Sequence, residues 1–125
     1  MQKVFYVGIG GFIGASLRYL ISLWAAKVFN FEIPMGTLIV NIIGGFLIGF
    51  IMEISLSTDL ISSELRLFIT TGILGGLTTF STFSYETINL LSDGSYIWGT
   101  LNAALNLFLS LAGVIAGRFI VKFII

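Results

Sequence analysis

The residues that could do chemistry in this chain are asparagine, serine and threonine side chains set four apart within apolar stretches. Asn102, Asn106 and Ser110 form one such line, and Thr37 and Asn41 form another. Residues four apart share one face of a helix, so each line presents amide and hydroxyl donors along a single track. Histidine and cysteine are absent, which removes the commonest general base and every thiol metal site. The lines are therefore either seams between helices or tracks lining a wet path.

A second candidate is the stretch Gly72–Phe83, which lies inside an apolar segment long enough to cross a bilayer. Its three glycines and its run of threonines and serine make it a poor helix former. This composition predicts a transmembrane helix that is broken near the midplane, with freed carbonyls that need a partner such as an ion. The alternative is that the glycines form a close-packing face and the hydroxyls bond neighbouring turns.

Other residues in the apolar stretches also allow two interpretations. Arg18 either faces an anion in a watery cavity or snorkels to the interface. Phe80 and Phe83 lie three apart, so both rings can point the same way, and lipid or core contact is their ordinary role. Glu86 is expected to meet interfacial water near the end of its span, with an intramembrane proton relay as the alternative.

The elements that must position these residues are membrane helices. The chain has 125 residues, of which 57% are hydrophobic and 10% charged, and its mean hydropathy is +1.07. A soluble domain of this size could not bury so much apolar surface. A net charge of zero gives no sign of a nucleic-acid partner. We expect one all-α integral membrane domain over residues 1–125, with spans at about 4–26, 35–53, 66–91 and 96–121.

The distribution of lysine and arginine bears on orientation. An even number of spans places both termini on one side, which carries Lys3, Arg66, Arg118 and Lys122. The other side carries Lys27, together with Arg18 if that residue is counted. The positive-inside rule therefore leans towards cytoplasmic termini. Because the imbalance is small, it could leave the orientation undecided.

Three motifs in this sequence resemble those of the Fluc/CrcB fluoride channels. They are Gly-Gly-Leu-Thr-Thr-Phe-Ser-Thr-Phe-Ser at 75–84, Gly-Thr-Leu-x-Val-Asn at 36–41 and Gly-Gly-x-x-Gly-Ala-x-x-Arg-Tyr at 10–19. The likeness covers all the expected spans. It implies a fluoride-selective channel in a prokaryotic plasma membrane that lets cytoplasmic fluoride leave passively, built as an antiparallel, dual-topology homodimer with two pores.

The resemblance also implies roles for individual residues. Phe80 and Phe83 turn their ring edges towards fluoride, and Asn41 donates a hydrogen bond to it. Backbone carbonyls of Gly75 and Thr78 hold a structural sodium ion between the subunits. The expected pore residues are Asn41, Phe80, Phe83, Ser81, Thr82, Ser110, Asn102, Asn106 and Thr37, with Arg18 in a vestibule. Asn102 and Asn106 enter this set by their spacing alone, and the vestibule position of Arg18 is predicted from its charge within the first span.

Two other functions remain open at this point. A small dual-topology exporter of drug cations, coupled to protons, also has short spans, but such proteins use a glutamate in the first span. Here the charged residue of that span is Arg18. A non-transporting assembly factor would use the glycine faces as dimer seams. Fluoride efflux, proton-coupled cation uptake, or neither would separate the three.

Overall fold

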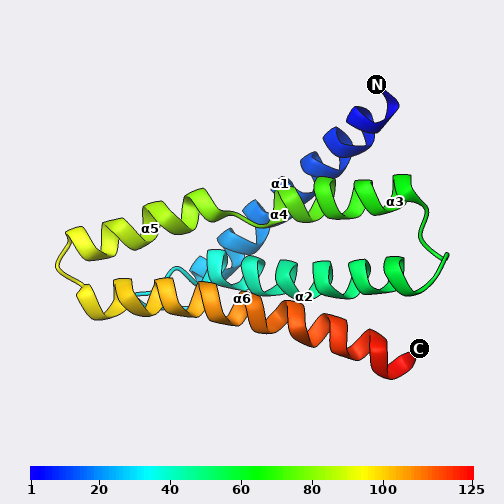
Figure 1. Ribbon diagram of the computed structural model, residues 1–125. Helices are drawn as coiled ribbons and strands as arrows, with labels where there is room; N and C mark the ends of the chain where they lie inside the picture. Colours follow the sequence, from blue (N-terminus) through cyan, green and yellow to red (C-terminus); the bar gives the residue numbers. More distant parts are fainter.

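Four helical segments of this protein are each long and apolar enough to cross a membrane, as the sequence predicts. The computed structural model describes all residues 1–125. The segments are α1 (Gln2–Val28), α2 (Met35–Ser57), an interrupted segment Ser63–Ser92, and α6 (Tyr96–Ile124). Because the chain runs back and forth, both termini lie at one end of the molecule (Figure 1).

The third segment is broken, as predicted, but the break is shorter than expected. The chain passes through α3 (Ser63–Leu67), the π-helical η1 (Phe68–Leu74) and α4 (Gly75–Leu77) before α5 (Phe80–Ser92) begins. Only Thr78 and Thr79 leave the helix, with extended backbone angles. All three glycines stay helical, so the adjacent β-branched threonines make the break. Thr79 then caps α5, because its side chain accepts a hydrogen bond from the Thr82 N–H at 3.2 Å.

The glycines of the third segment have different roles. A methyl group on Gly72 would lie 2.9 Å from the Cα of Gly10, and one on Gly76 would lie 2.6 Å from the Gly11 oxygen. These two glycines therefore form the close-packing face that was the alternative interpretation, and they let α1 lie directly on η1 and α4. Gly75 is exposed and would meet only the Thr70 oxygen, at 3.8 Å.

The most extensive helix contact is between α2 and α6. It also depends on glycine, since a methyl group on Gly45 would lie 2.6 Å from the Ser110 oxygen and one on Gly113 would lie 3.0 Å from the Ile42 oxygen. This close approach brings the polar line of α2 against the polar line of α6.

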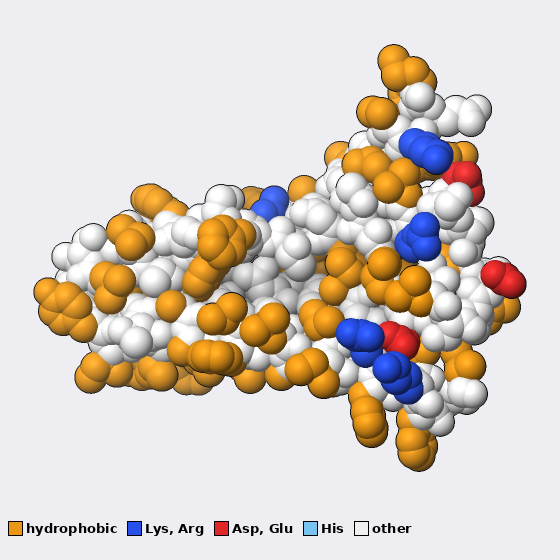
Figure 2. All heavy atoms as spheres, in the orientation of Figure 1, with side chains coloured by type: hydrophobic (Ala, Val, Ile, Leu, Met, Phe, Trp, Pro, Cys, Tyr) orange, Lys and Arg blue, Asp and Glu red, His pale blue; other side chains and the backbone are white.

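Most apolar side chains face outwards, since 21 of 125 residues are buried. The small core consists of Val40, Leu74 and Leu77. Figure 2 shows hydrophobic side chains over the body of the molecule, while acidic and basic side chains gather mainly at the end that holds the termini. An apolar exterior on helices of this length is the structure of a multi-pass membrane protein, in which lipid solvates the outer surface.

Candidate functional site

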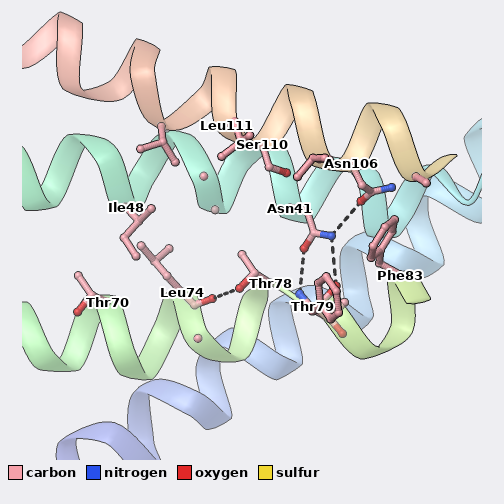
Figure 3. A pocket seen from close by; sticks show the side chains of 17 residues that line it. Asn41, Ile48, Thr70, Leu74, Thr78, Thr79, Phe83, Asn106, Ser110 and Leu111 are labelled. Atoms are coloured by element: carbon pink, nitrogen blue, oxygen red, sulfur yellow. Dashed lines mark hydrogen bonds between the residues drawn. The ribbon is translucent and has the colours of Figure 1, made fainter. Parts of the chain in front are cut away.

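A pocket of about 570 Å³ opens where α2, α5 and α6 meet η1 and α4. Its wall is largely apolar, with a few amides and hydroxyls turned towards it (Figure 3). The predicted site residues that line it are Asn41, Gly75, Thr78, Phe80, Phe83, Asn106 and Ser110. The fold therefore brings residues of three different spans into one pocket.

The amide of Asn41 closes the backbone gap left by the helix break. Its Oδ1 accepts a hydrogen bond from the Thr79 N–H at 2.9 Å, and its Nδ2 donates to the Thr79 oxygen at 3.2 Å. The second N–H of Asn41 donates to Asn106 Oδ1 at 2.9 Å. Both donors of Asn41 are thus engaged within the protein, and an anion can receive one only by replacing its present acceptor.

Behind Asn106 lies a second, buried amide. The Nδ2 of Asn106 donates to Oδ1 and to the backbone oxygen of Asn102, at 3.2 and 2.9 Å. The Nδ2 of Asn102 donates to Thr87 Oγ1 at 2.9 Å, and that hydroxyl donates to the Phe83 oxygen at 2.8 Å. Asn102 is fully buried and does not line the pocket, so the four-residue spacing predicts its face of α6 but not its depth.

The two phenylalanines are neighbours at the mouth of the pocket. Their ring centroids lie 5.5 Å apart, with the ring planes tilted by 59°. Both rings line the pocket, and Phe80 is 80% exposed. The prediction that the rings can point the same way agrees with this geometry, and contact of their electropositive edges with an anion stays a prediction.

The hydroxyls of the pocket differ in what they bond. Thr78 Oγ1 donates to the Leu74 oxygen at 2.9 Å, and Thr70 Oγ1 donates to the Arg66 oxygen at 2.8 Å. The Ser110 Oγ is buried and has no hydrogen-bond partner. Because a buried hydroxyl rarely stays unpaired, Ser110 is a candidate donor to a ligand, and its contact with an ion stays a prediction.

Other predicted residues lie outside this pocket. Ser81 and Thr82 are exposed at the start of α5, and Thr37 donates to Glu86 Oε1 at 2.7 Å. Arg18 is half-buried in α1, and its side chain makes no hydrogen bond or ion pair within the protein. Contact of these residues with an ion stays a prediction.

Glu86 lies deeper than the sequence indicates. It is half-buried and bonded to Thr37, and its Oε2 is buried without a hydrogen-bond partner. The expectation that Glu86 meets interfacial water is therefore wrong for this carboxylate, because α5 turns it towards α2. Its spacing of three from Phe83 was the signal that it shares the inner face of α5.

Two further sets of contacts were not predicted from the sequence. Thr87 pairs with Asn102 across the α5–α6 hairpin, and nearly equal distances from the turn at Gly94 could have revealed the pair. At the end with the termini, Glu53 Oε2 lies 2.9 Å from Arg118 Nε and Oε1 lies 3.8 Å from Lys122 Nζ. The Glu53 side chain is only 10% exposed, so this group ties α2 to α6.

Four membrane-spanning helices, with a largely apolar pocket that carries a few amides and hydroxyls between three of the spans, define a small polytopic membrane protein. The chain belongs to the CrcB-like family, because the family model described as "CrcB-like protein, Camphor Resistance (CrcB)" matches residues 5–118.

Similar proteins carry a shared name. A protein of Clostridium novyi named "Fluoride-specific ion channel FluC" is 62% identical over 118 residues, covering 94% of this chain and 92% of the relative. A protein of the same name from Methanococcus maripaludis is 50% identical over 118 residues, covering 94% of each chain. One from Ruminiclostridium cellulolyticum is 46% identical over 122 residues, covering 98% of this chain and 94% of the relative.

Proposed function

We propose that this chain is a fluoride channel that lets cytoplasmic fluoride leave the cell passively. The observation that carries the proposal is the convergence of Asn41, Phe80, Phe83 and Ser110 on one pocket. The relatives named as fluoride-specific channels support the choice of ion, and that name describes a channel and not an enzyme. The expected location is the plasma membrane of a prokaryote.

The pocket chemistry suits a small, strongly hydrated anion. A dry path must replace the water of fluoride with donors, and amides and hydroxyls do so without a fixed cation that would bind the ion too tightly. The unpaired hydroxyl of Ser110 supplies one such donor, and the amide of Asn41 supplies another once an anion replaces one of its present acceptors. Phe80 and Phe83 add ring edges, which carry the positive end of the quadrupole.

The working unit is proposed to be an antiparallel homodimer with two pores. The pocket lies open beside Phe80, which is 80% exposed, so a single chain does not enclose a path. A second copy on this face would close it, and two-fold symmetry would then give each chain one pocket. The weak charge bias between the two ends favours insertion in both directions.

A structural sodium ion is proposed at the dimer centre. Thr78 lies at the helix break, and no hydrogen bond reaches its carbonyl oxygen. Gly75, one helical turn before Thr78, is exposed on the pocket side. Carbonyl oxygens suit a hard monovalent cation, so these residues fit sodium, and the ion would supply positive charge that ties the broken helices of two chains together.

Arg18 is assigned to an aqueous vestibule. Its guanidinium is half-buried and unpaired within the chain, and it does not line the pocket. A free cation in that position raises the local concentration of anions without binding them in the narrow part of the path.

The deciding experiment is efflux from liposomes that contain the purified protein. Vesicles loaded with potassium fluoride should empty rapidly when valinomycin lets potassium follow, and vesicles loaded with potassium chloride should retain their ions. A proton-driven uptake of drug cations, with no fluoride release, would instead identify the alternative exporter. Absence of both activities would point to a non-transporting protein.

A further inference from the structure

A chain of five hydrogen bonds runs through the protein from the helix break to α5. The Thr79 N–H donates to Asn41, Asn41 to Asn106, Asn106 to Asn102, Asn102 to Thr87, and Thr87 to the Phe83 oxygen. The donor–acceptor distances lie between 2.8 and 3.2 Å. This series of hydrogen bonds begins at Thr79, the residue that caps α5, and ends at Phe83, one turn further along the same helix.

The direction of this chain is fixed by its two ends. A backbone N–H can only donate and a backbone carbonyl can only accept, so the terminal groups at Thr79 and Phe83 set the polarity. Each amide between them can then satisfy both neighbours in one orientation only. Asn102 and Asn106 are 0% and 4% exposed, so water cannot replace a lost partner cheaply.

The fixed polarity determines which N–H of Asn41 can be released. If an anion displaced Asn106 Oδ1, that oxygen would be left unpaired and facing a negative charge. It could not rotate away, because the Nδ2 of Asn106 is held by two acceptors on Asn102. The other acceptor, the Thr79 oxygen, makes the longer bond, 3.2 Å against 2.9 Å, and lies at the helix break.

We infer that Asn102 and Thr87 are positioning residues for the pore. They hold the Asn106 amide in one orientation, and thereby make the N–H of Asn41 that now bonds Thr79 the one that an anion receives. This inference rests on the proposed function, since it assumes that an anion passes through the pocket. It assigns to Asn102 a supporting role behind the pocket wall in place of the predicted contact with fluoride.

Thr87 offers the cleanest perturbation, because valine keeps its shape and removes the acceptor of Asn102. Thr87→Ser keeps the hydroxyl. Ser84→Ala is a matched control: Ser84 lies on the same helix and donates to the Phe80 oxygen at 2.8 Å, like Thr87 to Phe83, but it accepts no bond from an amide. This control distinguishes the effect of breaking the hydrogen-bond chain from the effect of removing any hydroxyl on α5.

Fluoride efflux from liposomes and size-exclusion of each variant are the first measurement. We expect Thr87→Val to remain assembled and to release fluoride about tenfold more slowly, which is about 1.4 kcal/mol of barrier. Thr87→Ser and Ser84→Ala should stay within about twofold of the parent protein. Equal slowing by Thr87→Val and Ser84→Ala, or no slowing by either, would overturn the inference. A parent protein that releases no fluoride would refute the proposed function instead.

A second measurement needs no variant. In the 1H–15N spectrum of the parent protein, the two side-chain protons of Asn41 give separate signals, and the proton on the same side as Oδ1 is the one that faces Thr79. Sodium fluoride, titrated against sodium chloride as control, should move that signal and leave the proton that faces Asn106 in place. Movement of the Asn106-facing proton alone, or of neither proton, would contradict the inference even if fluoride efflux is normal.

Discussion

At the scale of single residues, the ordinary and the functional interpretations of Phe80 and Phe83 lead to different outcomes. Phe80→Ile and Phe83→Ile keep apolar bulk, so a lipid-facing or core residue should lose little stability. A ring that meets an ion would lose the only electropositive edge at its position. A barrier raised by about 3 kcal/mol slows transport more than about a hundredfold. We therefore expect both variants to assemble normally while fluoride efflux from liposomes collapses.

The control for this prediction is a phenylalanine outside the pocket. Phe108 lies on α6, is 64% exposed and does not line the pocket. Phe108→Ile should leave efflux unchanged. Near-normal efflux from well-assembled Phe80→Ile and Phe83→Ile would show that both rings serve in packing and do not contact the ion.

Arg18 gives a prediction that depends on ionic strength. If its guanidinium attracts anions from an aqueous vestibule, Arg18→Gln should reduce fluoride flux at low salt and matter less at high salt, where the charge is screened. The measurement is initial efflux over a range of ionic strengths set with an impermeant salt. An equal loss at every ionic strength would indicate a structural role for Arg18.

The sequence predicts which face of a helix a side chain occupies better than it predicts how deeply that side chain is buried. Spacing by four placed Asn102, Asn106 and Ser110 on one side of α6, but only the last two reach the pocket. The depth of a side chain depends on how neighbouring helices tilt and cross, and periodicity within one helix carries no such information. Glu86 shows the same limit, since its place near the end of a span did not reveal its bond to Thr37.

At the scale of elements, the docking of α1 depends on the absence of side chains. A methyl group on Gly14 would overlap the Ile73 oxygen and lie 2.8 Å from the Leu77 nitrogen, both of which are backbone atoms. Because backbone cannot move aside cheaply, Gly14→Ala should destabilise the folded protein by about 1–3 kcal/mol. Unfolding by sodium dodecyl sulfate, followed by tryptophan fluorescence, measures this change.

Gly8 provides the matched control on the same helix. A methyl group there would meet nothing within 4 Å, so Gly8→Ala should be neutral or slightly stabilising, because alanine favours the helix. Equal stability of the two variants would show that the close approach of α1 to η1 does not support the fold.

Helix existence and the third-helix break followed from hydropathy and residue type, and the structure confirms both. The extent of the break did not follow. Glycine is a weak helix former in isolation, yet Gly72 and Gly76 stay helical because each lets α1 pack against its backbone. Packing between helices overrides local propensity here, and the sequence of the third segment alone does not contain that contact.

At the scale of the whole molecule, the antiparallel dimer can be tested by labelling. The chain contains no cysteine, so a single cysteine introduced by Gln2→Cys reports the side on which the N-terminus lies. In sealed vesicles, an impermeant maleimide added outside should label about half of the chains of an antiparallel dimer. Ser95→Cys, near the opposite end of the bundle, should give the same fraction. Complete labelling of one variant and none of the other would establish a single orientation.

The proposed sodium site also depends on the whole assembly, because one chain offers too few ligands. The ligands that we propose are backbone oxygens, and the carbonyl of Thr78, which accepts no hydrogen bond, is the best placed of them. Two-fold symmetry would double these oxygens at the centre of the proposed dimer, where an ion can link both broken helices.

An ion that binds only the folded dimer stabilises it by mass action, by about 2.7 kcal/mol at a hundred times its dissociation constant. Replacing sodium with N-methylglucamine should therefore lower the thermal midpoint of the purified dimer and slow fluoride efflux. As a control, changing the anion of the sodium salt from chloride to gluconate should leave the midpoint unchanged. A midpoint and an efflux rate that are both indifferent to sodium would contradict the proposed sodium site.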